Sequence, residues 1–163
     1  RGLGDVYKRQ PYHMAFWKSL KANPTPMTFS EVYIGLQQGT IDAQENPYEV
    51  IVSSRLYEQQ DYVVETNHLP HLISLIVSDE FFEGLSKKEQ NVITEASEIA
   101  KKYAREQSDT RIAEKIKVIE ESGTKIVPMS EELRQEVRDA SKGVTEEICH
   151  SVSKDIVDAY LEQ

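Results

Sequence analysis

The sequence contains little cysteine and glycine and no long apolar run. Among its 163 residues are 1 cysteine and 7 glycines. The single Cys149 cannot form an internal disulfide and has no cysteine neighbour with which to hold zinc, which excludes a disulfide scaffold and a zinc ribbon. No apolar stretch approaches the roughly 20 residues that a membrane-spanning helix needs. We therefore expect no direct insertion into a membrane.

Positive charge is also scarce. The chain has 19 Lys and Arg residues against 28 Asp and Glu residues, a formal net charge of -9. Such a balance disfavours sequence-independent binding to nucleic acid or to an anionic membrane surface. With 39% hydrophobic residues, the chain is large enough for one compact domain or for most of one lobe of a larger protein.

The first ten residues, RGLGDVYKRQ, do not look like the start of a protein. They lack an initiator Met and the apolar core of about 7 to 15 residues found in a signal peptide. The first helical pattern begins only at Tyr12. We expect residues 1–10 to be a junction or a non-native segment, and residues 11–163 to be the C-terminal part of a longer protein.

Short extended segments alternate with helices in the first third of the chain. After a helix over Tyr12–Lys21, the pattern predicts a strand at Thr25–Phe29 that leads into a helix at Glu31–Gln38. A second strand at Ile41–Glu45 leads into a helix with Asn46 as cap and Pro47 in its first turn. This alternation predicts an α/β fold in which helices cover a sheet, and it places Phe29 and Asn46 where strands end and helices begin.

The second half combines strands with long helices. Tyr62–Thr66 and Leu72–Ser78 are rich in β-branched and aromatic residues, and the nearly continuous apolar run of the latter predicts a strand buried on both faces. Thr124–Met129 predicts a further strand. A final amphipathic helix is expected from Ser130 to Tyr160, with Gly143 as its expected kink.

The longest predicted helix is Lys87–Ser122, which begins at a Ser86/Glu89 capping box and ends at Gly123. At about 1.5 Å per residue it would measure about 54 Å. Its apolar residues change face, from Val92, Ala96, Ile99 and Tyr103 to Ile112, Ile116 and Ile119. Such a helix either breaks in the middle or packs on two different bodies, and we favour the second interpretation.

Motifs for catalysis or metal binding are not visible. His68 and His71 are the only histidines close in sequence, but Pro70 separates them and no acidic or cysteine ligand has metal-site spacing. A G-x-S-x-G elbow and a phosphate-binding loop are missing as well. The sequence therefore predicts no metal, no cofactor and no catalytic residue. By pattern alone, Asn46 is explained by helix capping and Phe29 by core packing.

Three stretches nevertheless resemble one family. They are NPTPMTFSEVYIGLQQGTIDAQENP, SSRLYEQQDYVVETNH and FFEGLSKKEQNVITEA, within residues 11–150. In this order they resemble the extracytoplasmic solute-binding proteins of TRAP transporters, the DctP type. The resemblance implies a periplasmic-binding-protein-like fold of two α/β lobes (type II) that closes on an organic acid and delivers it to a TRAP membrane permease. It also implies a long helix that spans both lobes.

The resemblance implies a division of the chain and a set of ligand-binding residues. The N-terminal lobe would be largely missing, leaving a ligand-binding lobe over residues 11–85, a bridging helix over 87–122, and a C-terminal strand and helix over 124–163. Asn46 would hydrogen-bond the ligand carboxylate, and Phe29 would wall the pocket. Glu45 and His68 would orient the carboxylate-binding groups.

Two positions depart from the family pattern. The principal carboxylate-binding arginine of the family would fall on Val6, and the nearby Arg9 is out of register, so we assign it no role. Where the family motif D-G-Q-E-N-P has its glycine, this chain has Ala43. Two other interpretations stay open: a fragment of an α/β enzyme whose catalytic residues lie in the missing part, and a helical interaction module formed by Ser86–Gln163.

Overall fold

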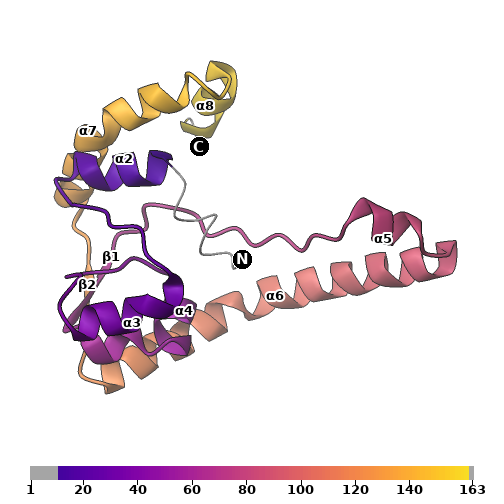
Figure 1. Ribbon diagram of the computed structural model, residues 1–163, viewed down its shortest axis with the longest axis horizontal. Helices are drawn as coiled ribbons and strands as arrows, with labels where there is room; N and C mark the ends of the chain where they lie inside the picture. Colours follow the sequence, from indigo (N-terminus) through magenta and orange to yellow (C-terminus); the bar gives the residue numbers. More distant parts are fainter. Residues whose placement is uncertain (1–10, 162–163) are drawn as a thin grey trace. The chain divides into compact units, whose positions relative to one another are not determined.

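A computed structural model describes residues 11–161 of the chain. The expected junction at residues 1–10, with Val6 and Arg9, lies outside the described residues. In chain order the elements are α2 (Pro11–Ser19), α3 (Phe29–Gln37), α4 (Tyr48–Ser53), the 3-10 helix η1 (Leu56–Gln59), β1 (Tyr62–Glu65), α5 (Asp79–Glu83), α6 (Lys87–Glu121), β2 (Lys125–Pro128), α7 (Glu131–Ile148) and α8 (Lys154–Leu161) (Figure 1).

These elements fall into two compact units. The first holds the described residues up to Gln44, the short stretch Val64–Thr66 and the residues from Val127 on. The second holds Glu45–Val63 and Asn67–Ile126. Strands β1 and β2 pair into a two-stranded sheet, and each strand passes from the second unit into the first.

The core of the second unit forms between α4, η1 and the C-terminal half of α6. Ile51, Leu56 and Ile119 are almost completely buried, and α4 lies against α6 (Figure 1). At the edge of this core the Lys115 ammonium lies 3.9 Å from the Glu49 carboxylate. Such packing of apolar side chains is the main stabilising contribution available to the unit.

In the first unit, α2 packs along α7 (Figure 1). A hydrogen bond between the Tyr12 hydroxyl and the Ser151 hydroxyl joins the start of α2 to the turn after α7. The guanidinium of Arg134 donates from Nη1 to the Thr66 carbonyl oxygen at 3.4 Å, and so links α7 to the end of the β1 segment. These contacts join segments that are far apart in sequence.

Helix α6 agrees with the prediction to within one residue at its C-terminal end. The Glu89 carboxylate accepts the Ser86 backbone N–H at 2.8 Å and the Ser86 hydroxyl at 2.6 Å, and these hydrogen bonds lower the pKa of Glu89. The helix does not break, because its hydrogen-bonded turns continue from Lys87 to Glu121. Ile119 is buried, whereas the other face is open to solvent, with Ile99 71% exposed.

Helix α6 is long enough to cross a membrane, but charged residues occur along its whole length. Within residues 11–161 no helix combines the length and the apolar character of a membrane span.

Three of the predicted strands are wrong. The residues at Thr25–Phe29, Ile41–Glu45 and Leu72–Ser78 belong to no strand and form no ladder. A strand requires a hydrogen-bonded neighbour, and in the described part of the chain only β1 and β2 pair with each other. Residues Leu72, Ile73, Leu75 and Ile76 are 82–87% exposed, so the expected burial is wrong as well.

Two helix ends also differ from the prediction. Helix α3 begins at Phe29, and its N-cap is Thr28, whose backbone N–H donates to the Glu31 carboxylate at 3.1 Å. The final helix is interrupted at residues 149–153 and not at Gly143. The Ser151 hydroxyl donates to the Ile148 carbonyl oxygen at 3.2 Å there. Such local side-chain hydrogen bonds compete with the helical ladder.

Candidate functional site

The four predicted site residues lie in different parts of the fold. Phe29 belongs to the first unit, whereas Glu45, Asn46 and His68 belong to the second. Residues 43–47 have no regular secondary structure and lead directly into α4. His68 follows β1, in the irregular segment after Asn67. The structure thus brings together segments of the second unit that are separated in sequence by α4, η1 and β1.

Asn46 is not the N-cap of α4. The cap is Pro47, whose carbonyl oxygen accepts the backbone N–H groups of Val50 at 2.9 Å and Ile51 at 3.1 Å. The expected capping role of Asn46 is therefore wrong, and residues 41–47, directly before α4, form no strand. Asn46 is half-buried one position ahead of the cap. Its side-chain amide can donate and accept hydrogen bonds.

Glu45 and His68 form a largely buried pair. Nε2 of His68 lies 3.6 Å from Oε2 of Glu45, and the side chains are 13% and 25% exposed respectively. Burial raises the pKa of Glu45 from 4.5 to about 7, because removal from water penalises the charged carboxylate. The pair therefore holds a carboxyl group that changes protonation near neutral pH, one residue before Asn46.

Phe29 is the first residue of α3 rather than the last residue of a strand. Phe29 is 41% exposed, which contradicts its interpretation as a core residue. The neighbouring core of α3 is instead formed by Val32 and Leu36. A Cβ atom at Gly35 would lie only 3.2 Å from the Ile41 side chain, so a larger residue there would require Ile41 to shift.

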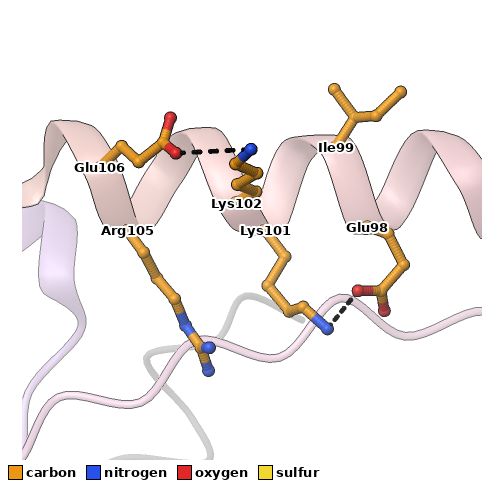
Figure 2. A pocket seen from close by; sticks show the side chains of 6 residues that line it. All are labelled: Glu98, Ile99, Lys101, Lys102, Arg105 and Glu106. Atoms are coloured by element: carbon orange, nitrogen blue, oxygen red, sulfur yellow. Dashed lines mark ion pairs between the residues drawn. The ribbon is translucent and has the colours of Figure 1, made fainter.

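A surface hollow along α6 has no features of a ligand site. Its lining residues are Glu98, Ile99, Lys101, Lys102, Arg105 and Glu106, all on one helix (Figure 2). Two ion pairs of helical spacing cross it, Lys101 to Glu98 at 2.5 Å and Lys102 to Glu106 at 3.8 Å. Exposed pairs of this kind stabilise a helix by a few tenths of a kcal/mol at most, about 0.2–0.5. We assign the hollow to the solvated surface of α6.

Sequence reasoning did not identify Arg134, which links α7 to the end of the β1 segment. Its nitrogen atoms lie within hydrogen-bonding range of the carbonyl oxygens of Thr66, at 3.4 Å, and Met129, at 3.5 Å. The partner Thr66 is 68 residues away in sequence. The spacing of apolar residues at every third or fourth position predicts helices, but it does not predict a contact between residues so far apart in sequence.

The chain is similar to proteins of one family along most of its length. The sequence pattern of the bacterial extracellular solute-binding proteins of family 7 (DctP) matches residues 8–151. The 2,3-diketo-L-gulonate-binding periplasmic protein YiaO of Escherichia coli is 31% identical over 145 residues, which are 85% of this chain and 44% of that protein.

Two solved structures have the same fold. A TRAP periplasmic solute-binding protein of Roseobacter denitrificans, with bound L-galactonate, superimposes with a TM-score of 0.77 at 33% identity, over 91% of this chain and 48% of that chain. One from Shewanella oneidensis, with bound succinate, superimposes with a TM-score of 0.82 at 27% identity, over 93% and 50%.

The chain spans half or less of the length of these relatives. The matched residues 8–151 include the stretch from Pro24 to Val50, with Phe29, Glu45 and Asn46. The chain belongs to the bacterial extracellular solute-binding proteins of family 7, the DctP family.

Proposed function

We propose that the protein carrying this chain captures a small organic acid outside the cytoplasm, in the periplasm, and delivers it to a TRAP-type membrane permease without catalysing a reaction. The observation that carries the proposal is the family match over residues 8–151. Members of this family are solute-binding proteins, which favours binding over the alternative of an enzyme fragment. It also weighs against a helical interaction module, because the match extends well before Ser86.

The chemistry of the proposed ligand follows from what the relatives bind. Three of the relatives bind 2,3-diketo-L-gulonate, L-galactonate and succinate respectively. All three are carboxylates, and two of them are sugar acids. A carboxylate group on a short carbon chain is therefore the shared feature that we propose for the ligand of this protein.

We assign four residues to the ligand. The Asn46 amide would donate to the ligand carboxylate, and the exposed ring of Phe29 would form an apolar wall. The Glu45–His68 pair would control the charge beside Asn46. An ionised Glu45 would repel an anionic ligand, whereas burial favours its neutral form up to about pH 7.

Calorimetric titration of the complete gene product with succinate, L-galactonate and 2,3-diketo-L-gulonate tests this proposal. We expect at least one acid to bind. Asn46→Ala should weaken its binding by roughly 1.5–3 kcal/mol, the range for a hydrogen bond to a charged group. Asn46→Asp should weaken it further, because the same-sized side chain then carries a negative charge.

The matched control is Asn91→Ala, on the exposed surface of α6, which should leave affinity unchanged. Loss of thermal stability without loss of affinity in Asn46→Ala would reduce Asn46 to a structural residue. Failure to bind any acid, or conversion of an acid observed by NMR, would contradict the proposed function.

A further inference from the structure

The chain makes a strained turn directly before His68. Asn67 has a φ of 44°, in the left-handed region that residues other than glycine seldom adopt. Just before it, the Thr66 backbone N–H donates to the Val64 carbonyl oxygen at 2.9 Å, which closes a turn of three residues. Between Thr66 and Asn67 the chain leaves the first unit and enters the second. Strained conformations persist only where the surrounding structure holds them, and they cluster at functional sites.

Arg134 holds this turn from the first turn of α7. Its Nη1 donates to the Thr66 carbonyl oxygen at 3.4 Å, and its Nη2 donates to the Met129 carbonyl oxygen at 3.5 Å. One guanidinium therefore joins the residues that directly follow β1 and β2. The Thr66 carbonyl belongs to the planar peptide group that leads into Asn67. A hydrogen bond from a charged donor restrains that peptide group, and with it the direction in which the chain leaves the turn.

The guanidinium is itself oriented by a carboxylate. Nε of Arg134 lies 3.5 Å from Oε2 of Glu131, which is three residues earlier on α7, and the Arg134 side chain is only 28% exposed. The planar fork of an arginine presents several donors in fixed directions, so it can contact one carboxylate and two carbonyl oxygens together. A lysine ammonium on a flexible stem does not reproduce this arrangement.

We propose that Arg134 is a positioning residue of the ligand site. By holding the Thr66 carbonyl, it fixes the turn at Asn67. This turn directs the His68 side chain, whose Nε2 lies 3.6 Å from Oε2 of Glu45. The consequence for a ligand rests on the proposed function, in which the pair of His68 and Glu45 controls the charge beside the ligand carboxylate.

NMR spectroscopy of the 163-residue chain tests the positioning without a ligand. At pH 8, Glu45→Gln should shift the imidazole resonances of His68, because it removes a neighbouring carboxylate. In an Arg134→Gln background the same substitution should cause a shift no more than about half as large, since contacting residues couple and separated ones do not. The matched control is Arg138→Gln, because Arg138 pairs with the same Glu131 at 3.1 Å, four residues further along α7. This background should retain the full shift.

Equal shifts in the Arg134→Gln and Arg138→Gln backgrounds would overturn the inference, because a residue that only stabilises the fold leaves the pair intact in folded molecules. Circular dichroism shows whether each variant folds. If Arg134→Gln does not fold, Arg134→Lys takes its place, since it keeps the charge and loses the planar fork. A reduced shift in Arg134→Lys would then support the inference, and a full shift would overturn it.

Calorimetric titration of the complete gene product with succinate, L-galactonate and 2,3-diketo-L-gulonate tests the effect on binding. Arg134→Gln should raise the dissociation constant of the bound acid about tenfold, the lower end of the range for one lost hydrogen bond to a charged group. Arg138→Gln should change it by no more than about twofold. If the unchanged protein binds none of these acids, the proposed function fails, and the NMR shifts still decide whether Arg134 positions His68. If it binds one, equal affinities of the two variants would overturn the role of Arg134 in the ligand site.

Discussion

Thr124 anchors the turn after α6 to η1, and this contact allows a stability effect to be calculated. Its hydroxyl oxygen lies 3.0 Å from the Tyr57 carbonyl oxygen and 3.1 Å from the Gln60 carbonyl oxygen, and the residue is only 6% exposed. Thr124→Val preserves the shape of the side chain and removes the donor. An unsatisfied buried polar group costs about 1–3 kcal/mol.

The Tyr57 carbonyl oxygen retains a second donor, the Gln60 N–H at 3.4 Å. The cost of Thr124→Val should therefore fall in the lower part of the range, at about 1–2 kcal/mol of unfolding free energy. Thr124→Ser is the matched control, because it keeps the hydroxyl and removes one methyl group, worth about 0.8 kcal/mol.

Urea unfolding followed by circular dichroism at 222 nm measures these differences. We expect stability to decrease from the unchanged chain to Thr124→Ser and then to Thr124→Val, with similar denaturant dependence for all three. If Thr124→Val were as stable as the unchanged chain, or more stable than Thr124→Ser, the anchor would depend on packing and not on the hydrogen bond.

Two further predictions concern helix capping and pH. Ser86→Ala should lower the free energy of unfolding by about 1 kcal/mol through loss of the α6 cap. The control Ser108→Ala, in the middle of α6, should not lower it. If urea unfolding showed the same loss of stability for both variants, the capping role of Ser86 would be contradicted. Because burial raises the pKa of Glu45 to about 7, the folded state retains this proton more strongly than the unfolded chain, and stability should fall as pH rises from about 4.5 to 7. At pH 8 the free energy of unfolding of Glu45→Gln should therefore be higher than that of the unchanged chain by roughly 1–3 kcal/mol, allowing for solvent screening. At pH 4 the two free energies should be equal. If the stabilities of the two proteins changed in parallel with pH, the raised pKa of Glu45 would be refuted.

The elements that could be predicted from the sequence are those whose signals are local. Helix α6 has a capping box at Ser86 and Glu89 and a stop at Gly123, which adopts a positive φ of 94°. These residues act within one turn of the helix ends that they define. Strands β1 and β2 were also predicted from short runs of β-branched residues, and both exist because they pair with each other.

The elements that could not be predicted depend on distant partners. Thr25–Phe29 and Ile41–Glu45 have suitable composition for strands, but neither has a ladder in the structure. Phe29 instead enters α3, because Thr28 and Glu31 form the cap one residue before it. Two hydroxyl residues, Thr28 and Ser30, compete to start this helix, and their sequence spacing alone does not decide between them.

The candidate site shows the same division. The Glu45–His68 contact joins the segment before α4 to the segment after β1, and only the family resemblance suggested that these residues act together. Its depth of burial, and hence the raised pKa of Glu45, depends on how these segments fold. The expectation that Asn46 caps a helix came from a local signal, and it failed because Pro47 takes that position.

The apolar segment around Leu75 has the composition of a buried strand, but it is exposed. Its composition predicts burial, and that prediction rests on the cost of exposing apolar side chains to water. Whether such a side chain is actually buried, however, depends on whether another segment of the fold covers it. In the second unit Ile51 and Ile119 cover each other's helices and are buried, whereas Leu72–Val77 is largely exposed. The apolar composition of this segment therefore predicts burial only where another segment covers it, and among the described residues of the second unit none does so.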